Sequence, residues 1–447
     1  MTGARSRGVR PGETEAAQWA MLGLAPAAIY LGHFFLGAAL PLPALILLMV
    51  LSGLLCIALS TRRARLEVAS IRPVWPLVTL FGLVIGSALL SLTDWAPGGG
   101  HPIWAWVDAP PAASINVSAT LIEIVKLIGL AAVFVLGCLM GATRDRARRS
   151  LQLVLWLGAA YALVSLVIFL GGEELGHASR RLTGGFATAN VAGAQFGVLS
   201  LLALSWGMRQ LRQSRHEPTA RRVTEVAPSV AALLLFLVCL MMTASRAALG
   251  ATGLAMAALT TWQAISDRRA RWPTIAAGCL VAVLAAVVFA RGNTLFVDRF
   301  DTLASGGEIR AAVYDAHWRA FLASPLSGYG LGSYSQLNNQ IMTSLNAPAL
   351  SDSVILHNAY LQWLVEGGVF GAAAIVLLIA AILGWTLWRM LQRQRNSTVL
   401  AGLLAASGLV LVHAAVDVPL NTPSFEAFWA LLLGLGFAMA QTSSIRR

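Results

Sequence analysis

Long apolar runs constrain this chain more than any other feature of its sequence. A helix that crosses the roughly 30 Å hydrocarbon core of a bilayer needs about 20 mainly apolar residues. Such runs recur between clusters of charged or turn residues, and we predict twelve spans from them, near 19–38, 42–60, 73–92, 119–141, 150–170, 191–208, 228–243, 247–265, 273–290, 368–388, 398–415 and 425–441. Only 12% of the residues are charged, against roughly 25% in soluble domains. The chain is therefore predicted to be an all-α polytopic membrane protein, and the composition argues against a soluble enzyme or a disordered chain.

The basic residues indicate how these spans are oriented. The chain has 32 basic and 20 acidic residues, a net charge of +12, and every basic residue except Lys126 is an arginine. The arginine clusters fall on alternate loops, at 5–10, 62–72, 144–149, 209–222, 268–271, 389–395 and 446–447. Because loops rich in arginine stay in the cytoplasm, both termini are predicted to be cytoplasmic. Most of the positive charge is thus a topology signal, and we expect no nucleic-acid partner.

One segment on the outer side is much longer than the others. The chain divides into residues 1–290 with nine predicted spans, an outer loop at 291–367, and residues 368–447 with three spans. Residues 308–322 place apolar and aromatic side chains near helical spacing, which predicts a short interfacial helix. The glycine-rich turn region PLSGYGLGSY follows at 325–334. It lacks the strand and helix of a dinucleotide-binding motif. We expect this loop to be the functional platform.

Arginines on the outer side are unexpected, because Lys and Arg favour cytoplasmic loops. Arg246 follows a very tight turn between two predicted spans, and Arg180 and Arg181 lie in a short loop. A charge near membrane depth is costly unless it is paired or faces a polar cavity. Guanidinium groups form bidentate hydrogen bonds with phosphate oxygens and stay charged when desolvated. We therefore predict that these arginines bind a pyrophosphate. The alternative is snorkelling, or structural pairing with Glu173, Glu174 or Asp417.

His357 is the candidate catalytic residue. It lies where the long loop meets the next span, and an imidazole that titrates near neutrality can accept a proton from an attacking hydroxyl. The alternative is a capping or packed histidine. Further residues expected to line the site are Arg180, Asn190, Arg310, His317, Tyr329 and Asn358. Glu123 and Lys126 are predicted to form a buried structural pair. The sequence has no metal-ligand spacing, so we expect no metal and no other cofactor.

Three segments carry a family resemblance. They are RLTGGFATANVAG at 181–193, MTASRAALG at 242–250, and the stretch from Arg310 through PLSGYGLGSY to HNAYLQWLVEGGVFG, which ends at Gly371. In this order, with a large loop before the histidine, they resemble the bacterial O-antigen ligase superfamily, which also contains polysaccharide polymerases. Where that family more often has a proline beside the asparagine, this chain has Ala189 before Asn190.

The resemblance implies a glycosyltransferase of lipopolysaccharide biosynthesis with a membrane fold related to the lipid-linked-sugar (GT-C-like) transferases. It implies a location in the bacterial inner membrane, a periplasmic active site, and catalysis without a metal. The donor would be a glycan on undecaprenyl pyrophosphate, and the acceptor a sugar hydroxyl of lipid A–core, both held among membrane lipid. The family's two arginines correspond to Arg181 and Arg246, and its histidine corresponds to His357.

Two alternatives to an O-antigen ligase stay open. A repeat-unit polymerase for O-antigen or exopolysaccharide differs only in the acceptor. Polymerases of the superfamily more often carry two sizeable basic outer loops, whereas residues 171–190 form only a short second loop here, which favours the ligase. An anion transporter, for an ion such as bicarbonate, would be expected to show internal repeats and broken helices at mid-membrane. The sequence has no visible repeat, and its outer arginines cluster at one face.

Overall fold

The computed structural model describes residues 20–107, 109–172, 181–266, 303–351, 355–393 and 397–442. Its α-helices are α2 (Ala25–His33), α3 (Pro41–Leu59), α4 (Arg62–Ala69), α5 (Val74–Leu90), α6 (Val117–Gly141), α7 (Arg144–Leu170), α8 (Ala189–Gln213), α9 (Thr219–Met242), α10 (Arg246–Ser266), α13 (Leu303–Ala323), α14 (Tyr334–Gln340), α15 (Ala347–Leu350), α16 (Ala359–Leu391), α17 (Thr398–Ala414) and α18 (Pro423–Gln441). Short turns of other helix types are η1 (Ala20–Leu24), η2 (Pro102–Trp106) and η3 (Pro419–Asn421). Within these ranges the only sheet-like pairing is an isolated bridge between Leu36 and Phe186. The prediction of an all-helical fold is confirmed.

The number of membrane-crossing helices differs from the prediction. Among the described residues, 7 helices are long and apolar enough to cross a membrane, or 8 if α4 and α5, bent by 87°, form one span. Helix α17 and residues 21–33 are apolar but shorter, and α10 does not reach the same hydropathy. The span expected at 273–290 lies outside the described residues. The structure supports a polytopic membrane protein, and the count of twelve is not confirmed.

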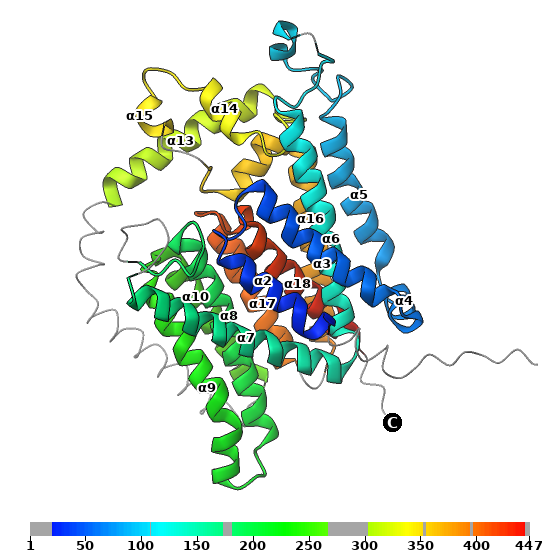
Figure 1. Cartoon of the computed structure of the whole chain (residues 1–447), viewed down its shortest axis with the longest axis vertical. Helices are drawn as coiled ribbons and strands as arrows, with labels where there is room; N and C mark the ends of the chain where they lie inside the picture. The colour runs from blue at the N-terminus through cyan, green and yellow to red at the C-terminus, as the bar shows by residue number, and fades with distance from the viewer. Residues whose placement is uncertain are drawn as a thin grey trace, which may run out of the picture.

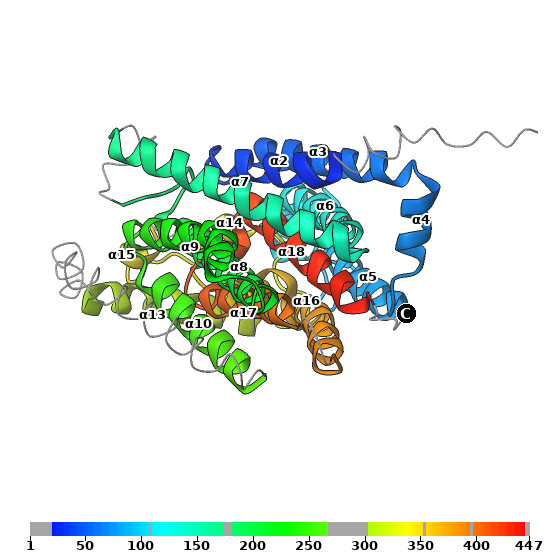
Figure 2. The same cartoon turned by 90° about the horizontal axis from the view of Figure 1, so that it is seen from below.

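The helices form layers around a central group. Helices α6, α8 and α18 lie between α2, α3 and α7 on one side and α10, α13 and α16 on the other (Figure 2). The apolar window of α8 is 94% buried, and that of α18 is 78% buried. Glycines allow α6 and α18 to approach closely, because a Cβ added at Gly137 would overlap the carbonyl of Leu431, and one at Gly434 would overlap that of Phe134. Small residues at such crossings are typical of helices packed in membranes.

The two ends of the helical bundle differ in charge. At one end α3, α6, α8, α16 and α18 finish, and several arginines lie nearby; we call it the basic end. Arginine side chains there cap helix C-termini. Arg65 donates to the carbonyls of Leu59 and Ser60 after α3, both at 2.9 Å. Arg393 donates to Met439, Ala440 and Thr442 at the end of α18. At the opposite end, which we call the histidine end, α16 begins next to His357.

The described part of the long loop is mainly helical and lies at the histidine end. Helices α13, α14 and α15 gather there beyond the bundle (Figure 1). The predicted interfacial helix at 308–322 is thus part of α13. Val313, Tyr334, Leu350 and Leu361 belong to one buried cluster that joins this loop to α16. The loop is therefore packed on the first turns of the helix that follows His357.

Helix α16 begins at Ala359 instead of 368, and it is broken at Gly368, where φ is 61° and ψ is −172°. This region of backbone conformation is open essentially only to glycine. The glycine-rich loop supplies the hydrogen bonds that the break removes. The N–H groups of Tyr329 and Gly330 donate to the carbonyls of Val365 and Glu366 at 3.0 and 2.8 Å, and Val369 donates to Pro325 at 2.8 Å. The spaced glycines therefore serve a helix break, and they fix the loop to α16.

Candidate active site

His357 immediately precedes the N-cap of α16. The side chain of Asn358 accepts hydrogen bonds from the N–H groups of Tyr360 and Leu361 at 3.1 and 3.0 Å, so the asparagine ends the loop and starts the helix. The side chain of His357 is 37% exposed. Its carbonyl accepts a hydrogen bond from the Tyr314 hydroxyl of α13 at 2.8 Å. The His-Asn pair thus holds a half-exposed imidazole at the start of a helix, with the loop helix α13 beside it.

Asp417 contacts this imidazole. It lies between α17 and α18, and its Oδ1 is 3.5 Å from Nδ1 of His357, within ion-pair range but longer than a good hydrogen bond. Its side chain is only 3% exposed, and the same oxygen accepts the N–H of Val418 at 2.9 Å. Burial acts to raise the pKa of Asp417, but His357, His413 and this N–H outweigh it and hold the pKa below its ordinary value. The carboxylate is therefore ionised and faces Nδ1 of His357.

Asn190 connects Asp417 to Arg181. The Asn190 amide donates to Oδ2 of Asp417 at 2.5 Å, and its Oδ1 accepts Nη2 of Arg181 at 2.6 Å. Asn190 is in the first turn of α8, which is capped by Thr188. A continuous polar chain thus runs from the guanidinium of Arg181 to the imidazole of His357. Its members come from three segments that are far apart in the sequence, one of which carries both Arg181 and Asn190.

The loop that carries Arg181 is held in place. Nε of Arg181 donates to the carbonyl of Thr243 at 2.7 Å, and the N–H of Leu182 donates to Met242 at 3.0 Å. The buried Tyr161 hydroxyl donates to the carbonyl of Gly184 at 2.7 Å. Gly184 has a positive φ of 59°, which a turn this tight favours in glycine. The loop is therefore oriented before any ligand binds.

Arg246 lies next to the turn that Arg181 contacts. The turn contains Ala244 with a φ of 47°, an uncommon conformation for a residue with a Cβ. Ser245 Oγ then accepts the N–H of Ala248 at 3.4 Å, as a helix N-cap does. Arg246 is the first residue of α10. A cation at a helix N-terminus opposes the helix dipole, so helix stability does not account for an arginine here.

The structure places the other predicted residues differently. His317 is fully buried, bonded to the carbonyl of Val313 at 2.8 Å and stacked on Tyr334 with ring centroids 4.9 Å apart. Burial lowers its pKa. Tyr329 is also buried, and its hydroxyl donates to the carbonyl of Ala320 at 3.0 Å. Arg310 is exposed on α13. Arg180 lies outside the described residues.

Asp417 was not predicted to belong to the site. It was expected only as a structural partner for an outer arginine, whereas the structure joins it to Arg181 through Asn190 and places it against His357. A signal was present, because Asp417 and Glu426 are the only charged residues from 397 to 444. Elsewhere, the predicted pair of Glu123 and Lys126 is confirmed at 2.7 Å.

The arrangement can polarise a nucleophile next to an anion site. An imidazole oriented by a buried carboxylate can take a proton, as a general base does. The guanidinium groups of Arg181 and Arg246, which belong to neighbouring segments at the histidine end, can stabilise the charge of a phosphate. This pairing suits transfer reactions in which a hydroxyl attacks and a phosphate leaves.

Comparison with known proteins gives one family. Residues 231–376 match the family model described as O-antigen ligase. The match includes Arg246, the long loop, His357 and the first part of α16 with its break, while Arg181, Asn190 and Asp417 lie outside it. No curated protein sequence matches the chain significantly. Residues 231–376 are thus similar to the O-antigen ligase family, and the apolar helices of the described residues are those of a multi-pass membrane protein.

Proposed function

We propose that this protein is an O-antigen ligase, a glycosyltransferase that moves a glycan from undecaprenyl pyrophosphate to a sugar hydroxyl of lipid A–core. One observation supports it above the rest: the polar chain that links the His357 imidazole, through Asp417 and Asn190, to the Arg181 guanidinium. The arrangement combines a base and an anion site at one end of a membrane bundle. The reaction would take place at the periplasmic face of the inner membrane.

In the proposed mechanism, His357 acts on the acceptor. The acceptor hydroxyl oxygen attacks the anomeric carbon and gives its proton to the imidazole. A carboxylate at Nδ1 favours the tautomer that carries its proton there, which leaves Nε2 free to accept. Asp417 would then stabilise the imidazolium that forms. This role needs Asp417 ionised at neutral pH, which its lowered pKa favours.

The arginines would act on the donor. As the new C–O bond forms, the bond between the anomeric carbon and the pyrophosphate oxygen breaks, and its electron pair stays on the pyrophosphate. Arg181 and Arg246 would bind this leaving group, because preorganised guanidinium groups stabilise charge that grows during the reaction. Arg181 is already oriented by Thr243 and Asn190. In this scheme the two cations perform the work that a divalent metal performs in other phosphate-leaving reactions.

A reconstituted reaction tests the proposal. Purified protein is incubated with undecaprenyl-pyrophosphate-linked glycan and lipid A–core, with and without a chelator of divalent metals. We expect glycan to appear on lipid A–core at equal rates in both reactions. Extension of the lipid-linked glycan without transfer to lipid A–core would instead identify a repeat-unit polymerase. Loss of transfer on chelation would contradict the role given to the arginines.

Deletion in the producing cell separates the same alternatives. Loss of a ligase leaves bare lipid A–core while polymer accumulates on the carrier lipid. Loss of a polymerase leaves core with a single repeat unit attached. Only the first outcome agrees with the proposal.

A further inference from the structure

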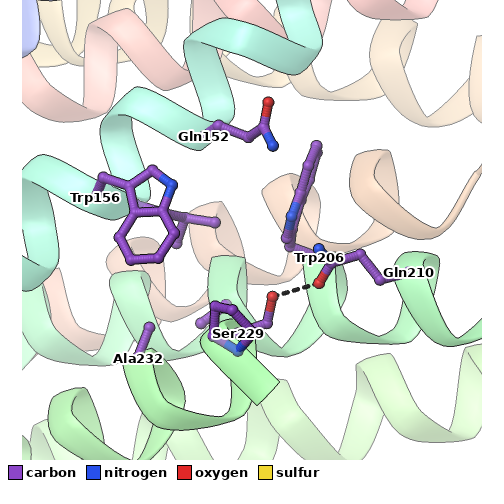
Figure 3. A pocket seen from close by; sticks show the side chains of 9 residues that line it. Gln152, Trp156, Trp206, Gln210, Ser229 and Ala232 are labelled. Atoms are coloured by element: carbon purple, nitrogen blue, oxygen red, sulfur yellow. Dashed lines mark hydrogen bonds between the residues drawn. The ribbon is translucent and has the colours of Figure 1, made fainter. Parts of the chain in front are cut away.

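A small cavity lies at the basic end, far along the helices from His357. Each of three helices contributes three lining residues: Gln152, Leu155 and Trp156 from α7, Ala203, Trp206 and Gln210 from α8, and Pro228, Ser229 and Ala232 from α9. Figure 3 shows the amide of Gln152 and the two indole rings around this space. Its volume is about 90 Å³, well below the roughly 300 Å³ at which pockets for small molecules begin. It can therefore accept only part of a larger ligand.

The walls of this cavity are apolar and amphipathic. The Trp156 side chain is 57% exposed on a helix that meets the criteria for a membrane span, so it faces lipid, whereas Trp206 is buried. The Ser229 hydroxyl donates to the side-chain oxygen of Gln210. Pro228 lacks an N–H, so the carbonyl one turn before it has no helical donor. Indole rings with polar groups beside them are typical of the membrane–water boundary.

Three arginines lie close in the sequence to residues that line this cavity. Arg148 and Arg149 lie one turn before Gln152 on α7 and are exposed. The guanidinium carbon of Arg209 on α8 lies 4.5 Å from the centre of the Trp206 ring. Arg148 and Arg209 are close enough to repel each other electrostatically. Like charges gathered on one groove favour an anion between them.

These arginines differ from three others at the basic end, which each have an acid beside them. Arg63 and Arg146 both pair with Glu67, and Arg221 pairs with Glu217. In the part of the chain that the structure describes, no carboxylate lies within ion-pair distance of Arg148, Arg149 or Arg209. Their charge is therefore available to a ligand.

We propose that this groove is a binding site for one anionic phospholipid. The phosphate is held by Arg148, Arg149 and Arg209. The glycerol and first acyl carbons lie in the cavity against Trp156 and Trp206. A lipid is favoured over a soluble phosphate because two indole rings line the cavity, and one of them, that of Trp156, is exposed on a helix apolar enough to cross a membrane. Basic pockets between membrane helices at the headgroup level bind anionic lipids in this way.

Native mass spectrometry of the detergent-purified protein tests the site. Protein is titrated with phosphatidylglycerol and, separately, with phosphatidylcholine of the same acyl chains. We expect tighter binding of one phosphatidylglycerol. The combined variant Arg148→Gln, Arg149→Gln, Arg209→Gln should lower that affinity by about tenfold or more, since each arginine near an anionic headgroup contributes to binding. Equal retention of both lipids by the wild type would overturn the proposal.

The control removes the same charge from the same end. Arg62→Gln, Arg63→Gln and Arg389→Gln delete three arginines away from the cavity, one of which, Arg389, also lies over an indole, that of Trp388. We expect this variant to keep the preference for phosphatidylglycerol. An equal loss in the control would show that general surface charge binds the lipid, which contradicts a built site.

Two further measurements protect the test from misfolding and from other ligands. Ala232→Phe keeps every arginine but fills the cavity, so it should weaken lipid binding. Phosphatidylglycerol should raise the melting temperature of the wild type but not that of this variant. Glycerol 3-phosphate and inorganic phosphate, each in large excess, should not displace the bound lipid. Displacement by either would assign the arginines to a soluble anion and overturn the lipid site.

Discussion

Arginines at the two ends of the bundle are held in different ways. At the basic end, Arg65 and Arg222 cap carbonyls a few residues away in the sequence, at the ends of α3 and α8. At the histidine end, Arg181 is oriented by Thr243 and Asn190, and Arg246 begins a helix, where the dipole disfavours it. Cations at helix C-termini stabilise the fold. The placement of the cations at the histidine end agrees with the proposal that they bind an anionic ligand.

This difference predicts which arginine variants affect chemistry. Arg246→Lys should lower the rate of glycan transfer by about a hundredfold or more, because removing one preorganised donor costs that much and an ammonium group cannot fork onto two oxygens. Arg65→Lys, with the same exchange at the basic end, should keep the rate within about twofold. The measurement is initial rate per folded molecule in detergent. Equal effects of the two variants would remove the distinction between the ends.

A second prediction concerns stability at the basic end. Arg146 makes two hydrogen bonds to Glu67, at 2.6 and 3.1 Å, and one to the carbonyl of Leu139 at 2.8 Å, with a side chain only 7% exposed. Arg146→Gln should cost about 3 kcal/mol of stability, since it leaves the largely buried Glu67 carboxylate with only the exposed Arg63 as an ion-pair partner. Thermal unfolding measures the loss. The rate per folded molecule should not change, and a strong loss of rate without loss of stability would contradict a structural role.

Asp417→Asn tests the coupling between carboxylate and imidazole. The amide is nearly isosteric but removes the negative charge that orients and stabilises the imidazole. We expect the rate of transfer to fall by about tenfold or more while the binding of donor changes little. A pH–rate profile provides the readout, because removal of the negative charge disfavours the protonated imidazole and should shift the acid limb to lower pH. An unchanged profile would show that Asp417 has only a packing role.

The smallest effect is expected from His317 in the loop cluster. Burial lowers the pKa of this imidazole, so the folded state binds fewer protons than the unfolded state at pH values between the folded pKa and the ordinary value of about 6.5. Stability should therefore decrease as the pH falls below about 6.5, by at most about 1.4 kcal/mol per pH unit. Hydrogen exchange in α13 reports it. His317→Phe should flatten this dependence, and a dependence equal to that of wild type would assign it to another group.

Much of the fold follows from local sequence properties. Apolar runs identified most helices, and the run at 308–322 identified part of α13. The span predicted to begin at 368 starts at the break in α16, and the structure adds a helical segment from Ala359 to that break. Paired glycines at 367 and 368 mark the break, and the glycine-rich loop supplies the hydrogen bonds that the break removes. A partner from another segment cannot be inferred from glycine spacing alone.

The sequence by itself determined the membrane class, the alternation of arginine loops, and the His-Asn and Ser-Arg motifs that led to the family. These properties depend on hydropathy, charge and short-range capping, which neighbouring residues decide. The tertiary structure alone decided that Asp417 contacts His357, that Asn190 links it to Arg181, and that His317 is buried. The reason is physical: a buried polar group must find hydrogen-bond partners, and in a helical bundle the nearest ones come from segments that only folding brings together.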